Sequence, residues 1–248
     1  MLVLVVALSA CQTTPRTPTA AGFGSPVVAS SSADATPPVR PLALEAPGAD
    51  PACVDPQDLT VHYINVGQGA STLVQGPTGI RLLYDFGDVG DGPAIINYLK
   101  ELGIGAGNAI DYAVLSHRHQ DHYYGYRDLV KAKIDVRIAN YDSEASTPKS
   151  SERPFTRWWG PAGSTTAGSP VAITPGQSID LGCGASAFVA AANGTLFDGK
   201  KVPLAQVDRN DRSVFLLIRY GDFQMTLDGD LGAGKELSLI HISEPTRL

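Results

Sequence analysis

Residues 116–122 read Ser-His-Arg-His-Gln-Asp-His and contain three of the five histidines of this 248-residue chain. The apolar segment 110–115, Ile-Asp-Tyr-Ala-Val-Leu, directly precedes them and has the composition of a buried strand. His117 and His119 lie two positions apart, so in extended backbone both side chains leave the same side of the chain. Where the chain bends away, the aspartate and the last histidine can aim at an adjacent point. The pattern therefore predicts a site at a strand end, in preference to a polar loop whose histidines are merely solvated.

Imidazole and carboxylate side chains together suit zinc, manganese or iron. Because the stretch offers two pairs of such groups side by side, it predicts two divalent ions, Zn or Mn, that share a bridging water. The ions of such sites lie roughly 3.5–4 Å apart. The metal ligands expected from this stretch are His117, His119, Asp121 and His122.

The stretch resembles the signature of the metallo-β-lactamase superfamily. Its surroundings are similar to the branch represented by the extracellular hydrolase domain of ComEC-type competence proteins. This resemblance covers about residues 59–232 and implies an α+β fold, the four-layer αββα sandwich. The segments that carry it, in the order of that branch, are residues 61–69 (Val-His-Tyr-Ile-Asn-Val-Gly-Gln-Gly), 82–87 (Leu-Leu-Tyr-Asp-Phe-Gly), 210–216 (Asn-Asp-Arg-Ser-Val-Phe-Leu) and 227–230 (Leu-Asp-Gly-Asp).

The resemblance also implies roles for residues outside the histidine stretch. Asp230 would bridge the two ions, with Asp228 as the competing candidate and an ordinary Asp-Gly hairpin turn as the alternative. Asp85 would support the ligand loop from behind, although a carboxylate at that strand end can also cap a turn. Asn210 and Ser213 would take the place of the histidine that most superfamily members supply midway.

Some positions depart from the family pattern. After the histidine stretch no histidine occurs before His241. Residues 238–248 resemble translated sequencing adapter, so we expect a truncated gene with a non-native tail and an incomplete domain. Ala70 and Tyr124 stand where the family motifs have an aspartate and a glycine, which predicts a reshaped pocket or lost activity.

The N-terminal region has the features of an export signal. Residues 2–8 form an apolar run too short to span a bilayer, and residues 8–11, Leu-Ser-Ala-Cys, resemble a bacterial lipobox. We therefore expect a signal peptide over 1–11, lipidation of Cys11 and a membrane-anchored protein facing the periplasm or the cell exterior. An ordinary secretory signal and a wrongly assigned start are the alternatives. Residues 12–57 are rich in Pro, Ala, Ser and Thr and predict a disordered linker to a domain over 58–237.

Two cysteines remain once Cys11 is lipidated. In an exported protein Cys53 and Cys183 can form a disulfide or stay as free thiols, and the sequence leaves both open. Hydrophobic residues make up 43% of the chain and charged residues 18%, which suits one globular domain.

The net charge of −6 gives no basic footprint for a long nucleic-acid duplex. Two bound cations would still create a local positive centre, which suits a small anionic molecule or a short nucleic acid as substrate. The membrane is the only other partner expected, and no protein partner is predicted.

Hydrolysis is the leading functional hypothesis. Divalent ions lower the pKa of bound water to about 7. The resulting metal-bound hydroxide, oriented by the catalytic Asp121 and Asp230, would attack phosphodiester bonds of nucleic acid or nucleotides. The first alternative is hydrolysis of C–O, C–N or thioester bonds, including β-lactams. The second is a non-catalytic binding lipoprotein with a degenerate site.

The sequence predicts strands first and then an alternation of helices and strands. Residues 59–66, 70–75 and 80–85 predict an antiparallel meander, and 93–102 has apolar residues at helical spacing. A strand over 110–115 and a helix beginning near residue 125 should then build a parallel-leaning sheet covered by helices.

Overall fold

The computed structural model describes residues 3–8, 53, 57–141, 170–201 and 209–232. The predicted lipidation site Cys11, most of the linker and the 238–248 tail lie outside these ranges.

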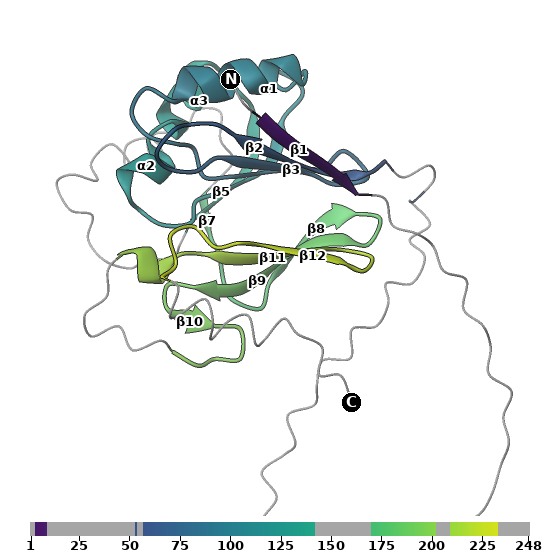
Figure 1. Ribbon diagram of the computed structural model, residues 1–248, viewed down its shortest axis with the longest axis vertical. Coiled ribbons are helices and arrows are strands. Elements are labelled where there is room, and N and C mark those ends of the chain that lie inside the picture. Colours follow the sequence, from purple (N-terminus) through teal and green to yellow (C-terminus); the bar gives the residue numbers. More distant parts are fainter. Residues whose placement is uncertain (1–2, 9–52, 54–56, 142–169, 202–208, 233–248) are drawn as a thin grey trace, which may run out of the picture.

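The first sheet has seven strands in the order β1-β2-β3-β4-β5-β6-β7 (Figure 1). Neighbours from β1 to β4 pair antiparallel, and those from β4 to β7 pair parallel. The predicted meander and the parallel-leaning continuation are therefore confirmed. The strands are β1 Val3–Leu8, β2 Leu59–Ile64, β3 Thr72–Gln75, β4 Arg81–Tyr84, β5 Ile110–Val114, β6 Val136–Tyr141 and β7 Pro170–Ala172.

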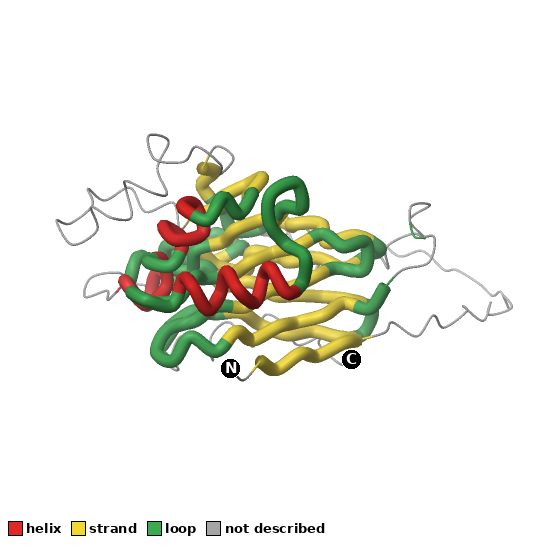
Figure 2. Tube along the Cα trace, turned by 90° about the horizontal axis from the view of Figure 1, so that it is seen from above, coloured by secondary structure: helices red, strands yellow, loops and turns green. Residues whose placement is uncertain are grey.

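Three helices cover one side of this sheet, as Figure 2 shows from above. They are α1 Gly92–Glu101, α2 Gln120–Tyr123 and α3 Tyr126–Lys131. In α1, a proline occupies the first turn, where its missing N–H has no intrahelical partner to lose. Ile95 and Leu99 repeat at helical spacing and are fully buried against the sheet. The single helix predicted to begin near residue 125 is in fact α3, preceded by the short α2.

The second sheet packs on the other face of the first. It contains the antiparallel strands β10-β9-β11-β12, and β8 also pairs with β9. An apolar core fills the space between the sheets, with Leu82 and Val114 from one side and Val189 and Leu216 from the other. The strands are β8 Ser178–Gly182, β9 Ala185–Ala192, β10 Thr195–Leu196, β11 Phe215–Tyr220 and β12 Phe223–Leu227.

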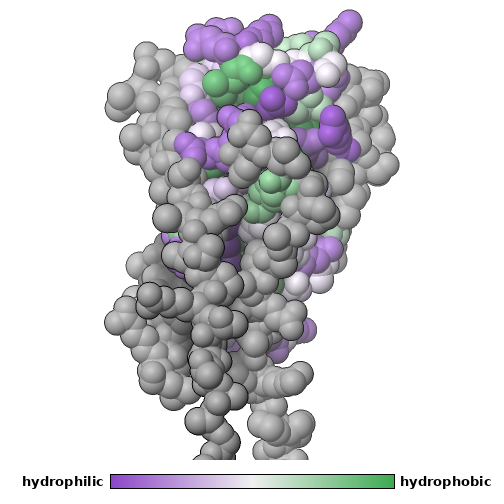
Figure 3. All heavy atoms as spheres, turned by 90° about the vertical axis from the view of Figure 1, so that its right-hand side faces the viewer, coloured by the Kyte–Doolittle hydropathy of each residue, from purple (hydrophilic) through white to green (hydrophobic). Residues whose placement is uncertain are grey.

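The arrangement is the predicted α+β sandwich, with a helical layer on two stacked sheets. Within the described residues, the outer face of the second sheet carries no α-helix. None of the described helices is long and apolar enough to cross a membrane. Figure 3 views the right-hand side of Figure 1, where hydrophilic residues are mixed with hydrophobic ones towards the helical layer.

A disulfide joins Cys53 to Cys183 and decides between the two alternatives left open by the sequence. Cys183 lies in the turn between β8 and β9. In the paired strands, Ser186 faces Arg219 at one end and Ala191 faces Phe215 at the other. The disulfide is at the Ser186 end, whereas the histidine stretch is at the Phe215 end, so the two occupy opposite ends of the sandwich.

Candidate metal centre

The histidine stretch follows β5 directly, as predicted. The chain bends at Arg118, has extended dihedrals at His119, with φ −83° and ψ 149°, and α2 then begins at Gln120. The change from extended to helical backbone turns the following side chains back toward the strand end. The site is therefore built by one strand end and the first turn of one short helix, together with segments from β4 and the second sheet.

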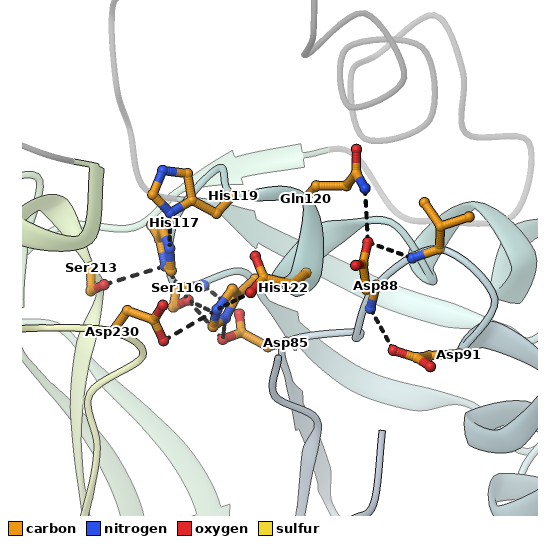
Figure 4. Close-up of polar contacts among 12 residues, drawn as sticks. Asp85, Asp88, Asp91, Ser116, His117, His119, Gln120, His122, Ser213 and Asp230 are labelled. Carbon is orange, nitrogen blue, oxygen red and sulfur yellow. Dashed lines mark hydrogen bonds and ion pairs between the residues drawn. The ribbon is translucent and has the colours of Figure 1, made fainter. Parts of the chain in front are cut away.

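His117, His122 and Asp230 bring one ligand atom each to a common point, and these atoms all lie within 4.8 Å of one another. The two imidazoles are buried, with 0% and 1% exposure, while Asp230 is 41% exposed. Nε2 of His122 is 3.2 Å from Oδ1 of Asp230, which arrives from the end of β12 (Figure 4). Two sheets thus contribute to one cluster with an open side.

The other two expected ligands lie at the edge of this cluster. Nδ1 of His119 is 3.0 Å from Nε2 of His117, and Oδ2 of Asp121 is 3.9 Å from Nε2 of His122. All five predicted ligands are therefore near one another, but His119 and Asp121 are outside the tight group of three.

The cluster fits a divalent metal ion. Nε2 of His122 is buried and makes no hydrogen bond, although a carboxylate oxygen lies close to it. The polar groups that face this nitrogen are the carboxylates of Asp230 and Asp121, at 3.2 and 3.9 Å, and a divalent cation bound between them would coordinate the imidazole once its proton has left. Two imidazoles and a carboxylate are also a ligand set that suits zinc.

Asp85 lies directly behind the histidines, at the end of β4. It is fully buried and has a left-handed backbone, with φ 60°. Its carboxylate accepts hydrogen bonds of 2.7 Å from the backbone N–H and from the hydroxyl of Ser116. Oδ2 is also 2.7 Å from Nδ1 of His122. This geometry matches the supporting role expected for Asp85, because metal-ligating histidines commonly donate their other N–H to a carboxylate.

The two buried imidazoles have opposite pKa shifts. Burial is the largest single influence on the pKa of His122 and lowers it. The hydrogen bond to Asp85 and its charge, together with the charges of Asp230 and Asp121, outweigh burial and raise this pKa to about 9. Burial, followed by the charge of His122, lowers the pKa of His117 to about 2. At neutral pH, His122 is therefore protonated and His117 neutral.

A short 3-10 helix, Arg209–Arg212, and Ser213 directly after it bring three more residues to the histidines. Oγ of Ser213 is 3.4 Å from Nδ1 of His117, and the Asn210 side chain also interacts with His117. The positive charge of Arg209 is close enough to lower the pKa of His117. Burial raises the pKa of Tyr84, and the charges of Asp85 and Asp228 add to this effect. Among the described residues Asp228 forms no ion pair with a histidine.

Sequence reasoning missed two residues of this site. Ser116 begins the histidine stretch and contacts three site residues, but a buried serine has no distinctive pattern. Arg209 precedes the segment 210–216, so its position next to a family motif was the one available signal.

Two glycines let the backbone approach the site closely. A Cβ on Gly229 would lie 2.7 Å from Cβ of Ser116 and 2.9 Å from Oγ of Ser213. A Cβ on Gly69 would overlap the backbone oxygen of Asp121. Both glycines also have positive φ, so they combine a conformation and a closeness that other residues cannot adopt together.

Comparisons with known proteins agree with this fold. The family described as the metallo-beta-lactamase superfamily matches residues 64–196. No curated protein gives a significant match.

Several solved structures are similar at low identity. A metallo-beta-lactamase with a HARLDQ motif from Cronobacter sakazakii is 18% identical over 70% of this chain and 60% of its own, with a TM-score of 0.42. A mutant of the metallo-beta-lactamase from Legionella gormanii is 18% identical over 69% of this chain and 61% of its own, with a TM-score of 0.44. This chain thus spans about 60% of the length of these proteins. Because the family match covers more than half of the chain, the protein belongs to the metallo-beta-lactamase superfamily of metal-dependent hydrolases.

Proposed function

We propose that the protein hydrolyses phosphodiester bonds of nucleic acids or nucleotides with the help of two divalent ions, Zn or Mn. One observation carries the hydrolase part of the proposal. His117, His122 and Asp230 converge from two sheets, and the buried Nε2 of His122 has no hydrogen-bond partner.

Divalent ions at this site would supply Lewis acidity and a water molecule of lowered pKa. In our proposal His117, His119, Asp121, His122 and Asp230 would hold the ions. The carboxylates of Asp121 and Asp230 would accept hydrogen bonds from the attacking water and orient it toward the substrate. Both are partly exposed, at 22% and 41%, so a substrate can approach from their side.

Two features support an anionic substrate. The segments 61–69 and 210–216 resemble the ComEC-type branch, whose hydrolase domains act on nucleic acid. The guanidinium group of Arg209 lies near His117, where it would attract a phosphate group. With a net charge of −6, short or single-stranded pieces suit the protein better than a long duplex.

The decisive experiment compares a phosphodiester reporter with β-lactam, ester and thioester reporters, each with and without added zinc or manganese. Our proposal expects metal-dependent turnover of the phosphodiester reporter. Preferential turnover of a lactam or ester would favour the C–O or C–N hydrolase instead. Bound metal without turnover of any reporter would favour a binding protein.

We also propose that the protein belongs to the ComEC-type branch, that it is exported and anchored by a lipid at Cys11, and that the domain is incomplete at its C-terminus. Mass spectrometry of the N-terminal peptide from a bacterial host tests lipidation at Cys11, and a Cys11→Ser variant should leave the membrane fraction. Sequencing the gene beyond codon 237 tests the C-terminal part.

A further inference from the structure

We propose that Ser116 is a positioning residue that connects the buried imidazole of His117 to the carboxylate of Asp85, which also binds His122 directly, and thereby directs Nε2 of His117 to the metal site. This inference rests on the proposed metal site. Ser116 is fully buried, and its hydroxyl is 2.7 Å from Oδ2 of Asp85 and 2.9 Å from Nδ1 of His117. The distance from the Ser116 hydroxyl to Nδ1 of His122 is longer, at 3.4 Å.

The direction of each hydrogen bond follows from the number of protons available. A carboxylate can only accept, so the one hydroxyl proton of Ser116 goes to Asp85. The Ser116 oxygen can then only accept from Nδ1 of His117. His117 must therefore carry a proton on Nδ1, which leaves its Nε2 with a free electron pair.

The same carboxylate orients the second imidazole. Oδ2 of Asp85 accepts from Nδ1 of His122 at 2.7 Å, so Nε2 of His122 is the atom that faces Asp230. Asp85 thus acts on His122 directly and on His117 through Ser116. The network explains how one buried carboxylate can prepare two metal ligands of the same type.

Other contacts agree with this direction. Nε2 of His117 is 3.0 Å from Nδ1 of His119, which can donate to it. Ser213 is the competing donor to Nδ1 of His117, but at 3.4 Å it is the weaker candidate. The packing of Gly229 against Ser116 also holds the serine in place from the side of the second sheet.

The first test needs no substitution. Long-range ¹H–¹⁵N NMR spectra of the full chain, treated with a chelator, show which nitrogen of each histidine carries a proton. We expect a neutral His117 with its proton on Nδ1, the tautomer that is less common for histidine in solution. A proton on Nε2 of His117 would overturn the proposal, whether or not the protein binds metal.

The second test compares Ser116→Ala with Ser71→Ala. Ser71 is equally small and almost as buried, and its hydroxyl makes no hydrogen bond to the described residues. Zinc affinity, measured by competition with a chromophoric chelator, should fall roughly 10- to 100-fold in Ser116→Ala. It should stay unchanged in Ser71→Ala, and Ser116→Thr should restore part of the affinity because it keeps the hydroxyl.

Equal zinc affinity of wild type and Ser116→Ala would refute the positioning role while leaving the metal site intact. Failure of the wild type to bind zinc would refute the proposed function, and the tautomer of His117 would still decide the role of Ser116. Thermal unfolding of each chelator-treated variant separates a lost hydrogen bond from a lost fold.

Discussion

Nε2 of His122 and Oδ1 of Asp230 lie 3.2 Å apart, although one residue follows the first sheet's β5 and the other follows the second sheet's β12. The distance places a buried nitrogen and a partly exposed oxygen where one ion can contact both. A site that joins the two sheets in this way couples metal binding to the correct packing of the sandwich. The expected consequences concern affinity, pH dependence and stability.

Replacing Asp230 by asparagine should weaken metal binding more than a substitution of Asp85 or Ser116, which contact the histidines but not the metal. The variant removes a charged ligand, so zinc affinity should fall by more than the roughly 10- to 100-fold expected for a lost outer partner. Isothermal titration calorimetry measures this directly. Asp228→Asn is the matched control, since its carboxylate has no ion pair with the described histidines. A similar loss in both variants would contradict the assignment of Asp230.

The stability of the chelator-treated protein should depend on the charge of His122. Its pKa is about 9 in the folded protein, against an ordinary value of 6.5. A raised pKa means that the protonated imidazole stabilises the fold fully below pH 6.5, and that this contribution is lost as the pH rises through 9.

Thermal unfolding between pH 6 and pH 10 tests this dependence. We expect a decrease in Tm on the order of 5 °C above pH 9. Asp85→Asn should flatten the dependence because it removes the carboxylate that raises the pKa. An unchanged pH profile in Asp85→Asn would show that other groups cause the decrease. Metal affinity should rise over the same pH range, because the proton on His122 must leave before a metal binds.

Gly69 and Gly67 offer a matched pair for testing close backbone approach. Both have positive φ, 93° and 71°, so alanine should cost about 1–2 kcal/mol at either position. Only at Gly69 would the added Cβ also overlap the backbone of Asp121, since nothing lies within 4 Å of one on Gly67. Gly69→Ala should therefore lower both Tm and zinc affinity, and Gly67→Ala should lower Tm alone. Equal affinities would show that the loop after β2 does not position Asp121.

Loss of the Cys53–Cys183 disulfide should destabilise the protein without altering the metal centre. Removal of a native disulfide typically costs about 2–5 kcal/mol, and this one closes a loop with a sequence separation of 130. Denaturant unfolding of Cys183→Ser against wild type measures the loss. Zinc affinity should stay the same because the bridge lies at the other end of the sandwich. A reduced zinc affinity would indicate that loss of the disulfide also changes the position of the metal ligands.

Much of the fold could be predicted because apolar and polar residues alternate along several strands and most turns contain glycine. The helix 93–102 agrees with α1 to within one residue, since Ile95 and Leu99 repeat at helical spacing. The four-residue α2 is too short to show any periodicity. Residues 3–8 show a limit of another kind, because a short apolar run suits a signal peptide and a strand equally well. Here their backbone pairs with β2, and N-terminal sequencing of the protein produced in a bacterial host would show whether they remain.

The five predicted metal ligands lie near one another because they follow strand ends that meet at one edge of the sandwich. Ser116 could not be singled out, since its importance depends on distances to Asp85 and His117 that arise only on folding. The disulfide was undecidable for the same reason, because Cys53 and Cys183 are far apart in sequence and have Cα atoms 5.2 Å apart in space.

The location of the disulfide bears on how the molecule can be handled. Cys53 joins the sandwich at the end away from the imidazoles, so a group coupled to the chain directly beside Cys53 holds the protein by that end. A resin, a vesicle or a carrier protein attached there would leave the candidate metal centre facing the solvent.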